Sequence, residues 1–339
     1  MTSEAEAALW DGDDVVDIVP TFIPGNLATK FVEPPFSVLD SRQGRWQARR
    51  RAWLSLGIKS ELGRDEGVLF KTASQDRLNA LLTAGPNPRG AMAEYNATSI
   101  FDPVLCELAY RWWAPPGGHV LDPFAGGSVR GIVAAKLGHP YTGMDLSGRQ
   151  IIANQQQAAE ILTDEEPFPI WMEGDSRTLD TRLPPGELYD MVFSCPPYFD
   201  LEVYSDDPAD LSNMDWWAFL EAYERIIEVV AERLRPGHFA VFVVSEIRGK
   251  EGNYRGLVPR TIHAFERVGL HLYNDAVLVN TVGTLALRAT RQFEAGRKLG
   301  RGHQNVLCFV KGTPERGWSY DRAAPPDPQL DLGFSDQAT

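Results

Sequence analysis

Acidic side chains follow three successive apolar runs of the chain, each at the point where the run ends. Asp122 follows HVL, Asp145 follows YTGM, and Asp175 closes the segment PIWMEGD. The carboxyl ends of parallel strands meet at one edge of a sheet, so these acids are expected around one crevice. A glycine pair, Gly126–Gly127, comes soon after the first acid and lets a ligand approach the backbone without Cβ interference.

The three acids fit a ligand built like an adenosyl amino acid. Asp122 can accept a hydrogen bond from a cationic amine, Asp145 from both ribose hydroxyls, and Asp175 from an adenine amino group. Each acid alone is equally compatible with an ordinary helix N-cap or loop aspartate. A nicotinamide dinucleotide site would need GxGxxG, and VLDPFAGGSVRG does not have that spacing.

A proline-rich loop follows the fourth apolar run, YDMVFS, and reads CPPYFDLEVYSDD. The adjacent prolines restrict the backbone from Cys195 to Tyr198. Tyr198 offers a flat face, and the carbonyls of Cys195 and Pro196 can act as acceptors because the residues after them have no amide hydrogen. Enzymes that modify a nucleic-acid base extrude it and hold it between such groups. The alternative is a proline-rich turn with a packed tyrosine.

The elements that must position these residues alternate in type. From His119 to Val268, short apolar runs alternate with amphipathic stretches, which is typical of βαβ units and a parallel sheet. Two further runs, Leu270 to Asn280 and Gln304 to Lys311, predict a closing hairpin with a long insert. Upstream, Arg45 to Leu56 predicts a basic helix, and Asp102 to Trp113 predicts a helix with Asp102 as N-cap and Pro103 in its first turn.

Composition narrows the classes of protein. A chain of 339 residues with 43% hydrophobic residues can bury one large core. No stretch is apolar and long enough to span a bilayer, and three scattered cysteines favour a reducing cytoplasm. The six scattered histidines lack metal-ligand spacing, so no metal is expected.

The net charge of −13 argues against a simple nucleic-acid coat, but basic residues gather in two islands. Arg42 to Lys59 holds six basic residues and no acid, and Leu285 to His303 holds five against Glu294. Interleaved aromatic residues favour nucleic-acid contact, although solvated faces would look similar. The residues expected to contact DNA are Arg45, Arg49, Arg50, Arg288, Arg291, Arg297, Lys298 and Arg301.

DPFAGG followed by a PPY loop after the fourth strand resembles the amino-group DNA methyltransferases, which methylate adenine N6 or cytosine N4. SIFDPVL (99–105) is similar to that family's N-terminal cofactor segment, and phage-type DNA methylases resemble more of the chain, including PPFSVLDSRQGRW and LEVYSDD. The resemblance implies a Rossmann-like α/β methyltransferase fold with a seven-stranded, mostly parallel sheet and an antiparallel C-terminal hairpin. It also implies S-adenosylmethionine as cofactor, double-stranded DNA with a flipped base as partner, and a setting in phage or restriction-modification systems.

The expected organisation is a disordered acidic N-terminus (1–20), a small N-terminal lobe with possible DNA contact (21–97), a catalytic domain (98–312) and a disordered tail (313–339). Homodimerisation is left open. The expected cofactor residues are Phe101, Asp102, Asp122, Pro123, Phe124, Ala125, Gly126, Gly127, Asp145, Leu146, Asp175 and Ser176. The expected catalytic residues are Ser194, Cys195, Pro196, Pro197 and Tyr198.

Cys195 departs from the family, which usually has Asp, Asn or Ser at this place to accept a hydrogen bond from the target amine. Either the Pro196 carbonyl holds the amine alone, or Ser194 or Asp200 supplies the oxygen, or the chemistry differs. A thiol beside a flipped base can also attack pyrimidine C6 and activate C5 for methylation. We rank that chemistry second, because nothing else in the chain resembles the C5 enzymes.

Three other functions remain as alternatives. A methyltransferase acting on RNA or on a small molecule would share the whole cofactor site. A nicotinamide-dependent dehydrogenase would keep the sheet but leave CPPY unexplained. A nucleic-acid-binding protein with a relic site would keep the basic islands without needing the cofactor.

Overall fold

A computed structural model describes residues 27–28, 31–59, 62, 101–199, 205–280 and 285–315. The chain divides into two compact units, Met1–Pro35 and Phe36–Thr339, and the second contains the sheet and its helices. The two expected disordered ends lie outside the described residues except for 313–315, as does most of the expected lobe at 21–97. That division of the chain therefore stays a prediction.

An eight-stranded sheet forms the centre of the unit, in the order β1-β7-β8-β6-β5-β2-β3-β4. All neighbouring strands are parallel except β8, which runs antiparallel to both β6 and β7. The strands are β1 (Val38–Asp40), β2 (Val120–Asp122), β3 (Tyr141–Asp145), β4 (Ile170–Glu173), β5 (Tyr189–Ser194), β6 (Leu234–Val244), β7 (Leu270–Val279) and β8 (His303–Lys311). The predicted Rossmann-like α/β fold, with a mostly parallel sheet and an antiparallel hairpin, is confirmed.

The expected count of seven strands is wrong by one. β1 pairs in parallel with β7, with Leu39 opposite Leu278, and extends the sheet beyond the closing hairpin. Leu39 is buried while Val38 is exposed. A strand of three residues is too short to show an alternating pattern, so the sequence carries no strand signal here.

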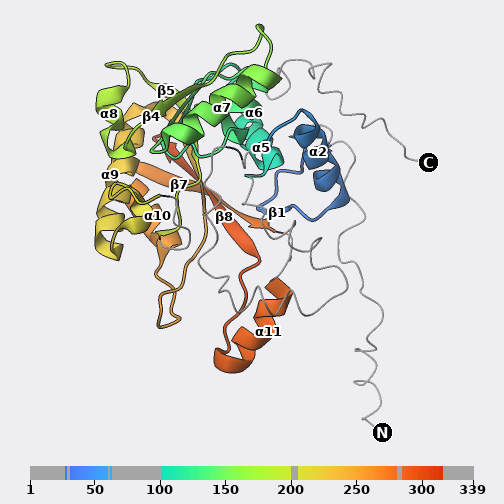
Figure 1. The fold of residues 1–339 in the computed structure, drawn as a ribbon, viewed down its shortest axis with the longest axis vertical. Helices are drawn as coiled ribbons and strands as arrows, with labels where there is room; N and C mark the ends of the chain where they lie inside the picture. The colour runs from blue at the N-terminus through green and yellow to red at the C-terminus, as the bar shows by residue number, and fades with distance from the viewer. Residues whose placement is uncertain are drawn as a thin grey trace, which may run out of the picture. The chain divides into compact units, whose positions relative to one another are not determined.

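Helices cover both faces of the sheet, as expected for a doubly wound fold (Figure 1). Helices α8, α9 and α10 lie on one side, and α5, α6 and α7 on the other. Their bounds are α2 (Gly44–Ser55), α5 (Pro103–Trp113), α6 (Val129–Lys136), α7 (Gly148–Ile161), α8 (Leu179–Arg182), α9 (Trp216–Arg233), α10 (Leu257–Arg267) and α11 (Leu285–Gly296), with short 3-10 turns η1 (Ser176–Thr178) and η3 (Leu211–Asn213).

The central strands are apolar along their length because helices cover them on both faces. In β6 the residues Phe239–Val244 are all buried, and Phe242 packs edge-on against Phe265 of α10 at 4.9 Å between ring centroids. Phe265 in turn stacks on Phe309 of β8 at 4.1 Å. This aromatic packing fixes the hairpin against the parallel strands.

The carboxyl ends of β2, β3, β4 and β5 share one edge of the sheet. β8 begins at this edge, because its antiparallel register places Asn305 opposite Val244 at the end of β6. The insert that carries α11 therefore projects beyond the same edge (Figure 1). None of the helices in the described ranges is long and apolar enough to cross a membrane.

Candidate active site

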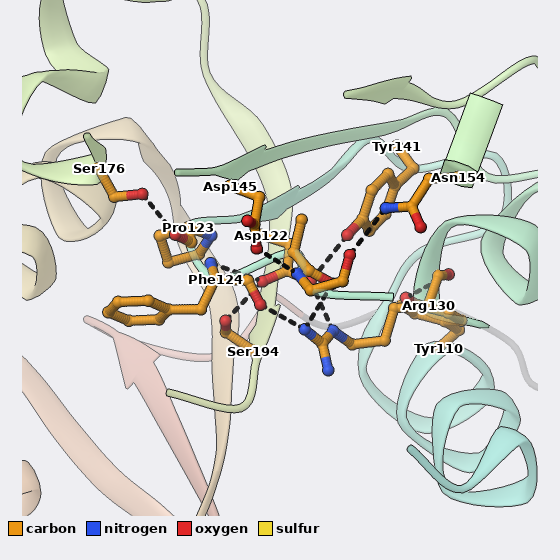
Figure 2. Close-up of polar contacts among 12 residues, drawn as sticks. Tyr110, Asp122, Pro123, Phe124, Arg130, Tyr141, Asp145, Asn154, Ser176 and Ser194 are labelled. Carbon is orange, nitrogen blue, oxygen red and sulfur yellow. Dashed lines mark hydrogen bonds and ion pairs between the residues drawn. The ribbon is translucent and has the colours of Figure 1, made fainter. Parts of the chain in front are cut away.

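Asp122, the last residue of β2, is completely buried and accepts four hydrogen bonds. One carboxylate oxygen accepts from the Phe124 amide (3.0 Å) and the Ser194 hydroxyl (2.5 Å). The other accepts from Arg130 Nε (2.5 Å) and the Tyr141 hydroxyl (2.8 Å). Figure 2 shows these contacts converging from β2, β3, β5 and α6. The carboxylate expected to hold a ligand amine is instead the internal hub of the site.

Arg130 is the partner that the sequence reasoning missed. It lies in the first turn of α6, is 5% exposed, and reaches back beneath the glycine turn. Its Nη2 donates to the carbonyls of Phe124 and Ala125, the latter at 2.9 Å. Burial alone would lower the pKa of Arg130, but the Asp122 carboxylate raises it above its ordinary value, so the guanidinium stays charged. The available signal in the sequence was an arginine in the segment VRG, close after the glycine pair.

Asp145 lies beside the glycine turn, as expected. One carboxylate oxygen accepts from the Gly126 amide and the other from the Ser147 amide, both at 2.9 Å. Asp145 is half-buried, and burial raises its pKa while the two amides oppose that shift. Each oxygen keeps a further lone pair, so a ligand hydroxyl can still bind.

Gly126 has the conformation that makes it useful here. Its φ of +51° lies in the left-handed region, and a side chain there would meet no atom closer than 3.9 Å. The space in front of the turn is therefore open to a ligand. Asn154 of α7 holds the turn from behind by donating to the Gly126 carbonyl at 2.7 Å, a contact that no sequence motif indicated.

Asp175 and Ser176 at the end of β4 have partners of their own. Asp175 caps η1 and forms an ion pair with Arg177 at 2.5 Å, so an adenine amino group would share or replace that contact. Ser176 is buried and donates to the Pro123 carbonyl at 2.5 Å. It ties β4 to β2 rather than facing a ligand. Leu146, after Asp145, is half-buried.

Phe101 and Asp102 approach the same region from the segment before α5. The Phe101 ring packs edge-on against Phe193 of β5 at 5.7 Å, and the Arg130 guanidinium lies over it at 4.7 Å. Asp102 is the N-cap of α5, as predicted, and its second oxygen accepts from Trp46 Nε1 at 2.9 Å. The Phe101 ring thus borders the glycine turn, whereas the Asp102 carboxylate has structural partners.

Helix α2, the first basic island, is fixed to α5 through the buried Glu107. This carboxylate accepts from Trp53 Nε1 at 2.8 Å and from Arg111 at 2.9 Å, and it forms an ion pair with Arg49. The Arg49 guanidinium faces this buried acid, and its expected contact with DNA stays a prediction. Arg45 and Arg50 are half-buried on the same helix.

The loop after β5 begins at the hub. Ser194 is fully buried and its hydroxyl donates to Asp122. The hydroxyl keeps lone pairs that can accept a hydrogen bond, so the alternative that Ser194 replaces the family's usual acceptor stays a prediction. Asp200, the other candidate, lies outside the described residues. Cys195 is half-buried, with its Sγ 3.6 Å from the Tyr198 hydroxyl. Pro196 is buried and Pro197 is half-buried between them.

Tyr198 is held by the closing hairpin. Its hydroxyl accepts from Gln304 Nε2 of β8 at 2.8 Å and lies 3.4 Å from the Val243 carbonyl of β6. A residue 106 positions away therefore sets the orientation of the aromatic face. Sequence spacing could not reveal this contact.

An arginine and aromatic cluster adjoins the loop and was also missed. Phe199, with a left-handed φ of +52°, packs edge-on against Trp216 at 5.1 Å. Arg255 lies over both rings, at 4.9 Å and 5.1 Å. Its Nε is buried with no hydrogen-bond partner among the described residues. Next to it, Arg260 lies over Trp217, whose side chain is 69% exposed.

The second basic island is better exposed than the first. Arg291 and Arg297 are exposed on and after α11, and Arg297 lies over the Phe293 ring at 5.2 Å. Lys298 is half-buried, and Arg301 donates to Asn305 at 2.6 Å. The backbone of Arg288 lies in α11, and its side chain is outside the description.

Comparison with known proteins gives a consistent but distant likeness. No family model matches the chain, and no curated protein matches it. Among solved structures, TrmN from Thermus thermophilus is 17% identical over 62% of this chain and 49% of its own, with a TM-score of 0.41. Magnesium protoporphyrin IX methyltransferase from Synechocystis PCC 6803, solved with bound SAM, is 15% identical over 72% and 93%, with a TM-score of 0.42.

A third match, also from Thermus thermophilus, is named as a candidate DNA modification methylase. It is 19% identical over 44% of this chain and 55% of its own, with a TM-score of 0.32. The matched region spans about half the length of TrmN and of this third protein. Likeness at this level does not identify the reaction, which has to be inferred from the residues of the site.

Proposed function

We propose that this chain transfers the methyl group of S-adenosylmethionine to an exocyclic amine of a DNA base. The observation that carries the proposal is the hydrogen bond of 2.5 Å between Ser194 and Asp122. It joins the last residue of β5, where the loop begins, to the last residue of β2, where the glycine turn begins, and the two strands are neighbours in the sheet. The crevice where a cofactor would bind and the loop that would hold the target thus share one anchor.

The residues present suit the cofactor. The open space in front of Gly126 lets the cofactor lie close to the backbone of the glycine turn. Asp145 offers lone pairs to the ribose hydroxyls. When bound, S-adenosylmethionine supplies an electrophilic methyl group on a sulfonium. The protein's task is then to bind, orient and exclude water, because a correctly aligned amine needs no strong base before transfer.

On the target side, Tyr198 and the Pro196 carbonyl have complementary tasks. Tyr198, tethered by Gln304, presents a fixed face for base stacking. The Pro196 carbonyl accepts a hydrogen bond from the target amine and aims its lone pair at the methyl group. Ser194 is fully buried and already bonded to Asp122, so we assign the target amine to the Pro196 carbonyl.

Two surfaces at the same edge favour a nucleic acid over a small molecule. The exposed Trp217 beside Arg260 offers a stacking face next to the loop. Beyond it, the insert carries the exposed Arg291 and Arg297. Arginine and aromatic side chains at one edge match the backbone charges and bases of a DNA strand.

The test is transfer of labelled methyl groups. Purified protein is incubated with methyl-labelled S-adenosylmethionine and with duplex DNA, RNA or neither, and label in the polymer is counted. We expect label in DNA and a loss of about tenfold or more with Asp145→Ala. Label in RNA alone would reassign the substrate, and binding of NADH in place of S-adenosylmethionine would reassign the enzyme class.

A further inference from the structure

Arg130 retains one nitrogen for which the described residues provide no partner. Its Nε donates to Asp122 and its Nη2 donates to two carbonyls of the glycine turn, whereas Nη1 has no hydrogen bond. The side chain is 6% exposed, and Nη1 is not among the atoms sealed from solvent. Figure 2 shows this nitrogen directed away from the Asp122 network.

The surroundings of this nitrogen match the expected cofactor crevice. On one side lies the glycine turn, and on the other the Phe101 ring at 4.7 Å from the guanidinium carbon. Both border the region where the amino-acid part of an adenosyl ligand would lie. The Arg130 side chain is nine-tenths buried, and a charged group in such a place is stabilised when a partner completes its hydrogen bonds.

We infer that Arg130 binds the α-carboxylate of the cofactor's amino-acid part. The inference rests on the proposed function and names a binding residue for it. Arginine stays charged at every physiological pH, and its free Nη1 can donate a charge-assisted hydrogen bond to a carboxylate. Asp122 fixes the guanidinium by holding Nε at 2.5 Å, so the free N–H is oriented before the ligand arrives.

The assignment reverses the expected roles of the hub. Asp122 was expected to meet the ligand's amine directly, and here it acts through Arg130 on the carboxylate attached to the same α-carbon. A purely structural Arg130 would also hold the turn in shape. The two roles differ in one measurable property, which is discrimination between ligands with and without the carboxylate.

The experiment is calorimetric titration with S-adenosylmethionine and with decarboxylated S-adenosylmethionine, which lacks only this carboxylate. We expect the wild-type protein to prefer the carboxylate-bearing ligand by about 10- to 100-fold, the range of a hydrogen bond to a charged group. In Arg130→Lys, and in the neutral pair Asp122→Asn with Arg130→Met, the preference should fall below about threefold. The control Arg177→Gln should leave the ratio unchanged.

Equal affinity of the wild-type protein for both ligands would overturn the inference, and this arm needs no variant to fold. A preference retained in the folded Arg130 variants would also overturn it. If the wild-type protein bound neither ligand, the proposed function itself would fail. These results are distinguishable, because only the last removes adenosyl binding altogether.

Discussion

Two aspartates at the ends of adjacent strands have different roles, because their hydrogen-bond partners differ. Asp122 and Asp145 end adjacent strands, yet Asp122 is surrounded by four donors from the protein while Asp145 accepts two backbone amides and keeps lone pairs for a ligand. The difference arises from Arg130, Tyr141 and Ser194, which reach Asp122 from other elements. Burial of an acid in a sheet end therefore favours a structural role when donors converge on it.

Asp145 should be needed for cofactor affinity. Asp145→Ala removes a charge-assisted contact to the ribose hydroxyls and should weaken S-adenosylmethionine binding by about 1 to 3 kcal/mol. Calorimetric titration of the folded variant measures this change. Unchanged affinity would remove Asp145 from the site.

The affinity should also depend on pH through the same residue. Only the ionised carboxylate accepts from both hydroxyls, and burial raises the pKa of Asp145 above its ordinary value. Cofactor affinity should therefore be full at neutral pH and fall on acidification, beginning at a higher pH than for an ordinary aspartate. Asp145→Asn should bind more weakly and lose this pH step. If the fall in affinity on acidification persists in Asp145→Asn, another titrating group causes it.

Cys195 decides between the two methylation chemistries. If the target is an amine, Cys195 only lines the pocket, and Cys195→Ser should keep or raise methyl transfer. If the target is pyrimidine C5, the sulfur is the nucleophile, and the variant should be inactive. Transfer rates of the two proteins, with 5-fluorocytosine DNA as a trap, measure this. A covalent complex that survives denaturation would contradict the amine assignment.

Stacking on Tyr198 gives a separate prediction. Tyr198→Ala should lose about 1 to 3 kcal/mol of base stacking, seen as weaker binding of DNA that contains the target. Tyr198→Phe keeps the ring but loses the contact with Gln304, so it should retain most of the affinity. Equal binding by wild type and Tyr198→Ala would place the base elsewhere.

At the scale of elements, the sequence predicted helices and strands well where periodicity was long. Helix α5 with its Asp102 cap and basic helix α2 formed as predicted, as did the hairpin of β7 and β8. What could not be predicted was which face of α2 turns inward. The inward orientation of Arg49 depends on Glu107, 58 residues away, and no local pattern carries that information.

The Glu107 contact makes a stability prediction. Burial alone would raise the pKa of Glu107, but Arg49, Arg111 and Trp53 lower it, so its contribution is present above the ordinary pKa and is lost as pH falls through the lowered value. Glu107→Gln leaves the arginines without their charge partner and should lower the free energy of unfolding by about 3 kcal/mol at neutral pH. Urea unfolding measures this, with the exposed Arg51→Ala as a control expected to change little. Equal stability of both variants would show that contacts other than those of Glu107 fix α2 to α5.

The insert with α11 should contact the DNA backbone. Because Arg301 is engaged by Asn305, the exposed pair Arg291 and Arg297 is the better test. Changing both to alanine should weaken binding to every DNA sequence alike and flatten the salt dependence by up to about two phosphate contacts. Cofactor affinity should not change. A salt slope identical to that of wild type would assign the insert to another role.

At the scale of the whole molecule, the order of the strands brings the two halves of the site together. Strands β2 and β5 are neighbours in the sheet, and so Ser194 and Asp122 touch although they lie 72 residues apart in the chain. Sequence reasoning predicted the doubly wound sheet because each βαβ unit has a local signal. It missed β1, Arg130 and Gln304, whose roles depend on contacts formed only when the sheet is complete.

Nucleoside analysis is the decisive measurement for methyl transfer to an exocyclic amine of a DNA base. DNA is incubated with the protein and with S-adenosylmethionine that carries a deuterated methyl group, digested to nucleosides and analysed by mass spectrometry. We expect the deuterated methyl group on adenine N6 or cytosine N4, and we expect it to be absent with Asp145→Ala. Label on cytosine C5, or on no nucleoside while the cofactor binds, would contradict this expectation.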